Sequence, residues 1–237
     1  MASAAPSTEL GQGYGRQRER LRTYFDSTAR RAWIDLTSDT SVSRIRQTVR
    51  AGRDAMRATL LSWLPQELDG RCLLDAGCGT GALSFDAAAR GAHVTAIDVA
   101  GGLVDVARAR GASEDARIDW RTGDMLDPAL GDFDHVAAMD SLIHYSADDL
   151  VSALAALSAR TRHSIVFTFA PYSPALAAML MIGRLFPRAN RSPAIVPVRE
   201  SELRRRLAAI DGWTIGRSQR IASGFYKSHA LELVRLA

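Results

Sequence analysis

Three alternate glycines, Gly77, Gly79 and Gly81, lie between a short apolar run and a helical pattern. Glycine adopts backbone conformations closed to other residues and lets a ligand approach the main chain, so this spacing predicts a strand, a tight ligand-binding turn and a helix. In an open α/β sheet such a turn lies beyond the carboxyl end of its strand, where ligands bind. The same letters satisfy the G-x-G-x-x-G/A fingerprint of dinucleotide-binding proteins, with Asp98 at about the expected distance of 20 residues. The glycines alone therefore leave the class of ligand open.

From residue 71 the chain alternates short apolar runs with amphipathic patterns. The apolar runs predict seven strands, over residues 72–77, 93–98, 116–124, 133–140, 163–171, 213–221 and 226–236. Helical spacing predicts helices over residues 82–91, 103–111, 148–160 and 199–211. Strands separated by helices of this size are typical of a parallel sheet covered on both faces, and the last two strands are close enough to pair antiparallel. The predicted fold class is α/β, with a doubly wound, mostly parallel sheet.

The predicted domain organisation is a flexible tail and an N-terminal helical arm over residues 1–64, followed by one α/β domain over residues 65–237. The arm contains helical patterns over residues 16–25, 28–36 and 41–64. Residues 171–198 interrupt the domain after its fifth strand, and we expect this insertion to form a helix and a loop over the open end of the sheet. Since no apolar run reaches the roughly 20 residues of a membrane-spanning helix and no secretory signal is recognisable, we expect a cytoplasmic location.

Basic residues concentrate before the sheet. Between residues 16 and 57 the chain has eleven arginines and five acidic residues, an excess of six positive charges. A solvated helical face explains such a segment, and so does a site for an anionic ligand, a nucleic acid or a charged lipid surface. Because neither a nucleic-acid-binding module nor a mixed lysine and aromatic patch accompanies the arginines, we expect no nucleic-acid partner.

Aspartates stand at the ends of four predicted strands: Asp75, Asp98, Asp124 and Asp140. At the open edge of a sheet, these carboxylates would repel a pyrophosphate and attract a ligand with an ammonium and a sulfonium group. This favours S-adenosylmethionine as the cofactor over a nicotinamide or flavin nucleotide. We expect Asp98 to bind the ribose, Asp124 the adenine amino group, and Asp75 with the backbone at Asp140 the methionine ammonium. The expected cofactor site also includes the neighbouring residues Ala76, Gly77, Gly79, Val99 and Met125.

The turn DAGCGTG, the acidic strand ends and the closing hairpin resemble those of class I methyltransferases, over about residues 65–170 and 200–237. This resemblance implies the strand order 3-2-1-4-5-7-6, with the last strand antiparallel. It does not identify the methyl acceptor.

Five short segments resemble, in the same order, those of a narrower group, the magnesium-protoporphyrin O-methyltransferases of chlorophyll and bacteriochlorophyll synthesis. They are YF at 24–25, LDAGCGTGALS at 74–84, MDSLIHY at 139–145, FAP at 169–171 and LFP at 185–187. The resemblance implies methyl transfer from S-adenosylmethionine to one propionate of magnesium-protoporphyrin IX, giving the monomethyl ester. It points to His144 and Tyr24 as the residues that position the acceptor carboxylate by hydrogen bonds. The structural alternatives are a histidine satisfied within its loop for His144 and an aromatic lid packed on the cofactor for Tyr24. Asp26 and Ala32 depart from the family pattern, in which an asparagine follows YF and an arginine precedes the tryptophan.

A flat, apolar macrocycle with a second propionate calls for a broad apolar surface and an arginine. In the insertion, Met179 would contact the ring, and Arg184, Arg188 or Arg191 would bind the second propionate; an apolar helix packed on the sheet is the alternative. Magnesium belongs to the porphyrin, so we expect no protein metal site. The resemblance also implies association with a magnesium chelatase subunit and a peripheral membrane contact.

Three other functions would use the same core residues. A methyltransferase for another small carboxylate, phenol or quinone precursor would share the cofactor site. A nucleic-acid methyltransferase would use the arginine excess, and a porphyrin carrier would keep the fold without catalysis. The intact acidic edge favours an enzyme over a carrier.

Overall fold

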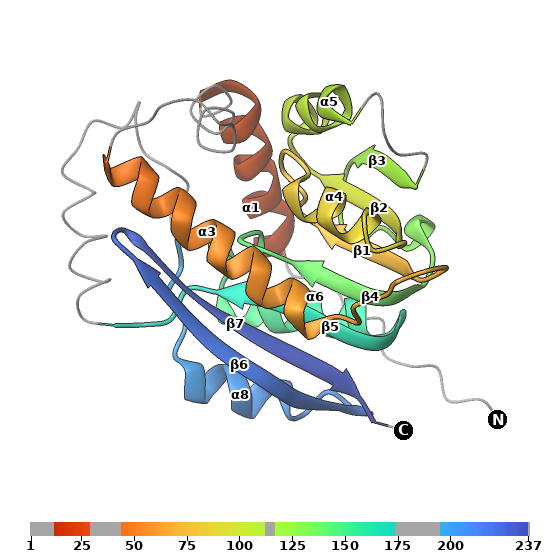
Figure 1. The fold of residues 1–237 in the computed structure, drawn as a ribbon. Helices are drawn as coiled ribbons and strands as arrows, with labels where there is room; N and C mark the ends of the chain where they lie inside the picture. Colours follow the sequence, from red (N-terminus) through yellow and green to blue (C-terminus); the bar gives the residue numbers. More distant parts are fainter. Residues whose placement is uncertain (1–11, 29–43, 112–116, 174–194, 237) are drawn as a thin grey trace.

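The computed structural model describes residues 12–28, 44–111, 117–173 and 195–236 (Figure 1). Most of the second predicted arm helix, residues 29–36, lies outside the described residues, and this range includes Ala32. So does most of the insertion, including Met179, Arg184, Arg188 and Arg191.

In the described part of the chain, seven strands form one sheet in the order β3-β2-β1-β4-β5-β7-β6. The strands are β1 Cys72–Ala76, β2 His93–Asp98, β3 Ile118–Thr122, β4 Phe133–Ala138, β5 Thr161–Phe169, β6 Trp213–Ser223 and β7 Tyr226–Arg235. Strands β1 to β5 pair in parallel, whereas β7 runs antiparallel to both β5 and β6. The predicted fold class and strand order are confirmed. Because the order reverses at β1, the carboxyl ends of β1, β2 and β4 face a common crevice.

Helices cover both faces of the sheet (Figure 1). They are α1 Gln12–Thr23, α3 Arg44–Trp63, α4 Ala82–Ala88, α5 Gly101–Arg110, α6 Ala147–Ser158 and α8 Glu200–Leu207, with single turns η1 Tyr24–Thr28, η2 Pro128–Leu130 and η3 Leu142–His144. One hydrophobic core lies between the sheet and α3, α4 and α5, and the other lies between the sheet and α1, α6 and α8. Strand β4 is buried along its whole length because it is covered on both sides.

Helix α3 packs across the β6–β7 hairpin, as Figure 1 shows for the orange helix and the blue strands. Its buried residues Met56 and Leu60 are four positions apart on one helix face, and with Leu64, which directly follows the helix, they join the core of the sheet. Burial of each side chain of this size contributes roughly 1.5–3 kcal/mol. The predicted boundary between the arm and the domain at residue 64 stays a prediction. Helix α3, which precedes this boundary, shares the hydrophobic core of the sheet.

Gly52 is the point of closest approach between α3 and the hairpin. A Cβ atom at this position would lie 2.6 Å from Cδ1 and 2.9 Å from Cβ of Tyr226. The Tyr226 Cβ is close to the main chain, so a rotation of the ring alone does not relieve the contact. A glycine inside a helix costs about 1 kcal/mol relative to alanine. Here it allows the Tyr226 ring to pass against the helix.

The two ends of the insertion lie side by side next to η3. The Tyr172 N–H donates to the Val198 carbonyl and the Val198 N–H to the Ala170 carbonyl, both at 2.9 Å. The Val196 N–H donates to the Ile143 carbonyl at 2.9 Å. The described residues at both ends of the insertion are therefore attached to the loop that follows β4.

We predict that Gly52→Ala destabilises the fold by roughly 1–3 kcal/mol, because the added methyl group overpacks the contact with Tyr226. Urea denaturation at constant pH measures the difference. Gly15→Ala is the matched control, since Gly15 is exposed on α1 and an added Cβ there meets nothing within 4 Å. The control should be as stable as the unchanged protein or up to about 1 kcal/mol more stable. Equal stability of the two variants would contradict the prediction.

Candidate active site

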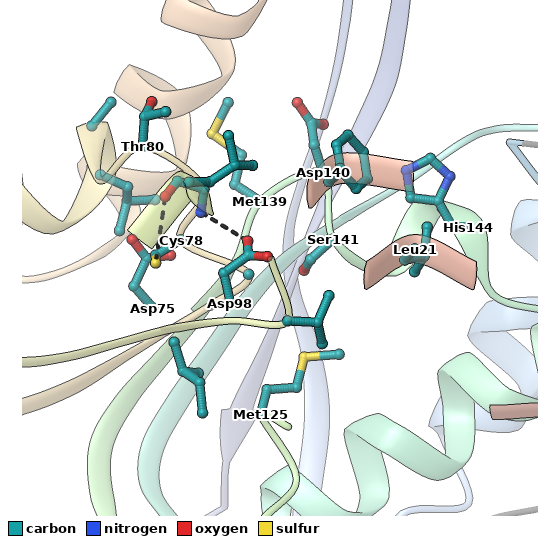
Figure 2. Close-up of a pocket in the computed structure, with 18 of the residues that line it drawn as sticks. Leu21, Asp75, Cys78, Thr80, Asp98, Met125, Met139, Asp140, Ser141 and His144 are labelled. Carbon is teal, nitrogen blue, oxygen red and sulfur yellow. Dashed lines mark hydrogen bonds between the residues drawn. The ribbon is translucent and has the colours of Figure 1, made fainter. Parts of the chain in front are cut away.

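A cavity of about 360 Å³ opens at the carboxyl ends of β1, β2 and β4 (Figure 2). Its volume is within the range of roughly 300–1,000 Å³ found for small-ligand sites. The glycine turn, the ends of β2 and β4, and helices α1 and α3 form its walls. The predicted site residues that line it are Asp75, Gly77, Gly79, Asp98, Val99, Met125, Asp140 and His144. Ala76, Asp124 and Tyr24 are not among the described residues that line it.

The glycine turn fits closely against the loop that follows β4. Gly77 has φ +90°, a left-handed conformation that other residues adopt only under strain, and its N–H donates to the Ile97 carbonyl at 2.8 Å. A Cβ atom at Gly77 would also collide with the Ser141 side chain. The glycine therefore permits both the turn and the approach of the Ser141–His144 segment to the cavity.

Asp98 ends β2 beneath the turn, as Figure 2 shows. Its Oδ2 accepts the Gly79 N–H and its Oδ1 accepts the Ala100 N–H, both at 2.9 Å. Burial raises the pKa of Asp98, and these backbone donors oppose the rise. Since an ionised carboxylate accepts about four hydrogen bonds, Asp98 keeps acceptor capacity for a pair of ligand hydroxyl groups.

Asp75 is buried at the end of β1. Its Oδ2 accepts a hydrogen bond from the Ser84 hydroxyl at 2.6 Å. Burial raises the pKa of Asp75 to about 7, and the bond from Ser84 opposes the rise. Because a cation nearby favours the ionised form, a positively charged ligand group in this cavity would be stabilised by Asp75.

Asp124 is bound by helix α1 instead of facing the cavity. Its Oδ1 accepts the Tyr14 hydroxyl at 2.7 Å and the Leu126 N–H at 3.0 Å, and its Oδ2 forms an ion pair with Arg18. Tyr14 in turn stacks on Tyr145, with ring centroids 4.8 Å apart. The prediction placed Asp124 at the right strand end, but its partners come from the distant N-terminal helix.

Asp140 has φ +55°, an uncommon conformation for a residue other than glycine. Its N–H donates to the Thr168 hydroxyl at 2.8 Å. Its carboxylate accepts the Tyr226 hydroxyl at 3.0 Å and pairs with Arg53 Nη1 at 2.8 Å. Contacts from β5, β7 and α3 thus hold a strained residue at the cavity wall, as is often seen at functional sites.

The arginines of α3 were missed as site residues. Arg50, Arg53 and Arg57 line the cavity together with Asp54. Their spacing of three and four residues places them on one helix face. That periodicity was visible in the sequence as part of the arginine excess, but nothing local indicated that this face points toward the strand ends.

His144 ends η3 and is buried in the cavity wall, with its ring centroid 6.2 Å from that of Phe25 (Figure 2). Tyr24 is half-buried in the turn η1 and meets Phe25 edge to face, with ring centroids 5.1 Å apart. Phe25 lines the cavity, whereas Tyr24 is not among the described residues that line it. The Phe25 ring therefore meets the rings of both predicted positioning residues, of which only His144 lines the cavity.

Ser141 also lines the cavity, and within the described residues its buried hydroxyl has no hydrogen-bond partner. A buried hydroxyl without a partner costs free energy, so this atom is suited to bind a polar ligand group. Among the described residues, no group of three or more histidines, cysteines or acids is arranged to hold a metal ion.

Comparisons with known proteins identify the family. A sequence model described as magnesium-protoporphyrin IX methyltransferase C-terminus matches residues 138–235, and a general methyltransferase-domain model matches residues 73–164. A magnesium-protoporphyrin O-methyltransferase of Rhodobacter capsulatus is 48% identical over 221 residues, which cover 92% of this chain and 97% of the relative. The chain belongs to the magnesium-protoporphyrin O-methyltransferase family.

Crystal structures of the family member from Synechocystis PCC 6803 share the fold. The structure with bound SAH has a TM-score of 0.78 and 28% identity, covering 92% of this chain and 99% of that one. The structure with bound SAM has a TM-score of 0.73 and 25% identity, covering 99% of this chain and 100% of that one. The family resemblance predicted from the sequence is confirmed.

The cavity described above suits the functional groups of S-adenosylmethionine. Asp98 can accept the ribose hydroxyls, the buried Asp75 can stabilise a cation, and the Ser141 hydroxyl needs a polar partner. The glycine turn leaves the main chain open to close approach of a ligand. The donor and acceptor set therefore fits the cofactor that the family uses.

We predict that Asp75 makes the protein less stable as the pH rises. The pKa of Asp75 is about 7 in the folded protein and 3.8 in the unfolded chain, so the folded state binds the extra proton between these values. Stability should fall by roughly 1.4 kcal/mol per pH unit from about pH 4 to pH 7 and then level off. Asp75→Asn, which cannot ionise, should lack this component.

Urea denaturation of both proteins without cofactor, at pH 5, 6, 7 and 8, measures this component as the difference between their free energies of unfolding. The free energy of unfolding of the variant, relative to that of the unchanged protein, should increase from pH 5 to pH 7 and then stay constant. A constant difference across the series would contradict the prediction.

Proposed function

We propose that the protein transfers a methyl group from S-adenosylmethionine to a propionate carboxylate of magnesium-protoporphyrin IX, giving the monomethyl ester. The observation that carries the proposal is the 48% identity to the Rhodobacter capsulatus enzyme along nearly the whole of both chains. The cavity at the strand ends, with its acidic groups and buried histidine, supports it.

Residues at the strand ends would hold the cofactor. Asp98 would accept the ribose hydroxyls, and Asp75 with the backbone at Asp140 would bind the methionine ammonium. The main chain from Ala76 to Gly79 would approach the ligand, and Val99 and Met125 would flank the adenine. Asp124 would contact the adenine amino group through the acceptor capacity that remains beside its bonds from Tyr14, Leu126 and Arg18.

The reaction needs positioning more than it needs a base. A propionate has a pKa of about 4 and is ionised near neutral pH, so the nucleophile exists without proton transfer. When bound, S-adenosylmethionine supplies an electrophilic methyl group on a sulfonium. As the new carbon–oxygen bond forms, the carbon–sulfur bond breaks and its electron pair stays on sulfur. The protein must align the carboxylate oxygen and exclude water, which is worth several kcal/mol of the barrier.

His144 and Tyr24 would position the acceptor carboxylate by hydrogen bonds. The burial of His144 in the cavity wall supports this role. For Tyr24 the support is indirect, since its ring meets that of the lining residue Phe25 and it is not itself among the described lining residues. Arg184, Arg188, Arg191 and Met179 stay predictions for the contact with the macrocycle.

Partners and location follow from the family. Association with a magnesium chelatase subunit would deliver the substrate, and a peripheral membrane contact would suit an apolar product. Within the described residues, no helix combines the length and the apolar character needed to cross a bilayer. We also propose, as the family resemblance implies, a cytoplasmic protein that makes surface contact with the membrane.

Methyl-labelled S-adenosylmethionine with magnesium-protoporphyrin IX tests the proposed function. The expected result is label in a porphyrin monomethyl ester, and alkaline hydrolysis of this ester should release the label as methanol. A small carboxylate, a phenol and a quinone precursor serve as competing acceptors in separate reactions. Transfer to one of these with none to the porphyrin would replace the proposed function by the alternative O-methyltransferase.

We predict that His144→Gln lowers kcat roughly ten- to a hundredfold, because the flexible glutamine amide does not hold its N–H at the position where the imidazole ring aligns the acceptor carboxylate. The affinity for S-adenosylmethionine, measured by calorimetry, should not change. His93→Gln is the control, since His93 is exposed at the start of β2, at the opposite end of the strand from the cavity. Full turnover by the His144 variant would remove this residue from the site.

A further inference from the structure

The β6–β7 hairpin has an aromatic side chain at its turn. Ser223 pairs with Tyr226, so Gly224 and Phe225 alone connect the two strands. Such turns favour glycine and small polar residues, yet the Phe225 side chain is 55% exposed. Phe225 belongs to neither of the two hydrophobic cores of the described residues. The packing of the fold therefore gives no reason for an aromatic ring at this position.

The turn projects from the edge of the sheet at which the cavity opens. Because β7 runs antiparallel to β5, its first residues lie at the carboxyl end of β5. The pairing of these strands ends where His229 meets Phe169, so Tyr226, Lys227 and Ser228 extend beyond β5 and pair only with β6. At about 3.4 Å per residue, the turn stands roughly 10 Å beyond the last pair with β5.

Helix α3 supports the turn and adds positive charge to it. Gly224 has φ +55°, and a Cβ atom there would collide with the Thr48 side chain, so the main chain of the turn rests against the start of α3 (Figure 1). Arg44 lies one helical turn before Thr48. Arg44, Arg46 and Lys227 are all exposed. Three exposed cations therefore lie on the two elements that meet at the turn.

No acidic residue offsets these charges in either segment. The sequence has no aspartate or glutamate between residues 44 and 53, nor between residues 212 and 231. The remaining basic residues of the hairpin, Arg217 and Arg220, form ion pairs with glutamates farther from the turn. The turn thus has a positive potential of its own, which attracts an anionic surface.

We propose that the hairpin tip, formed by Phe225 and Lys227 with Arg44 and Arg46 of α3, docks on an anionic lipid surface. The headgroup region of a bilayer accommodates an exposed aromatic ring, and cations beside the ring bind the anionic lipids. One apolar anchor alone gives only marginal binding, so the ring and the charges act together.

A lipid surface fits the hairpin tip better than a protein partner does. A stable protein interface buries about 800 Å² on each partner around an apolar centre. The other large hydrophobic side chains exposed in the described part of the chain are Tyr172 and Leu236. Leu236 follows β7 at its far end, and Tyr172 lies under the Arg199 guanidinium. Among the described residues, the tip therefore has a single exposed ring with cations, and not an extended apolar patch.

The use of this contact rests on the proposed function, in which substrate and product are largely apolar porphyrins. The hairpin tip and the cavity share one edge of the sheet, so docking brings the cavity opening close to the lipid. The residue after Phe225 also reaches the cavity wall, since the Tyr226 hydroxyl donates to Asp140 at 3.0 Å. A porphyrin dissolved in the bilayer then has a short path to the cavity.

Co-sedimentation with lipid vesicles tests the proposal. One set of vesicles is phosphatidylcholine alone, and the other is phosphatidylcholine mixed with phosphatidylglycerol in equal parts. The unchanged protein should bind the mixed vesicles only, and added salt should weaken this binding because it screens the charges. Phe225→Ser and Lys227→Glu should each weaken it roughly ten- to thirtyfold, since one loses the inserted ring and the other changes the charge by two units.

Two variants away from the tip are the matched controls. Leu236→Ser removes a side chain that is 57% exposed at the other end of the hairpin. Arg205→Glu makes the same change of charge at an exposed position of α8, on the opposite face of the sheet from α3. Both should bind the mixed vesicles like the unchanged protein. Phe225→Trp should keep the affinity, because tryptophan also inserts at the headgroup level.

Urea denaturation and methyl transfer to a porphyrin held in detergent show whether the variants fold, and neither should change. Equal vesicle binding by Phe225→Ser and Leu236→Ser would overturn the proposal. So would the absence of binding to the mixed vesicles, and a loss of binding to the magnesium chelatase subunit in Lys227→Glu would then assign the tip to a protein partner. Lipid binding as predicted by a protein that methylates no porphyrin would support the tip and refute only the proposed function.

Discussion

The close fit of the loop after β4 against the glycine turn is the constraint on which the site depends. Gly77 is free of a side chain where Ser141 approaches, and its left-handed backbone turns the chain from β1 into α4. Ser141, η3 and His144 take their places from this contact. The turn thus shapes the part of the cavity proposed for the cofactor and also sets the position of the residues proposed for the acceptor.

Electrostatics gives the cavity two different sides. Burial raises the pKa of both Asp75 and Asp98, and donors from Ser84 and the main chain oppose that rise. On the α3 side, Arg53 compensates the charge of Asp140. The strand ends therefore favour cationic and hydroxyl groups, whereas the guanidinium groups on the α3 side are paired with carboxylates.

Much of the fold could be predicted from the sequence because the signals are local. The alternation of apolar runs and helical patterns indicates the strands, and parallel strands bring Asp75, Asp98 and Asp140 to one edge. The strand order came from the resemblance, since no periodicity encodes which strands are neighbours. Arg53 was missed because the contact of α3 with the hairpin joins residues far apart in the chain. Asp124 lay at a predicted strand end, but its partners Tyr14 and Arg18 are 110 and 106 residues away in the sequence.

The position of β7 in the sheet has a consequence for how the protein is made. This strand follows all the others in the chain, yet it lies between β5 and β6. Until it leaves the ribosome, β5 has an unpaired edge, which is a template for association with other chains. Tyr226 is the first residue of β7, so its hydrogen bond to Asp140 also forms only after β7 has been synthesised. During translation, a growing chain can complete neither the sheet nor the ligand-binding wall before this late segment inserts.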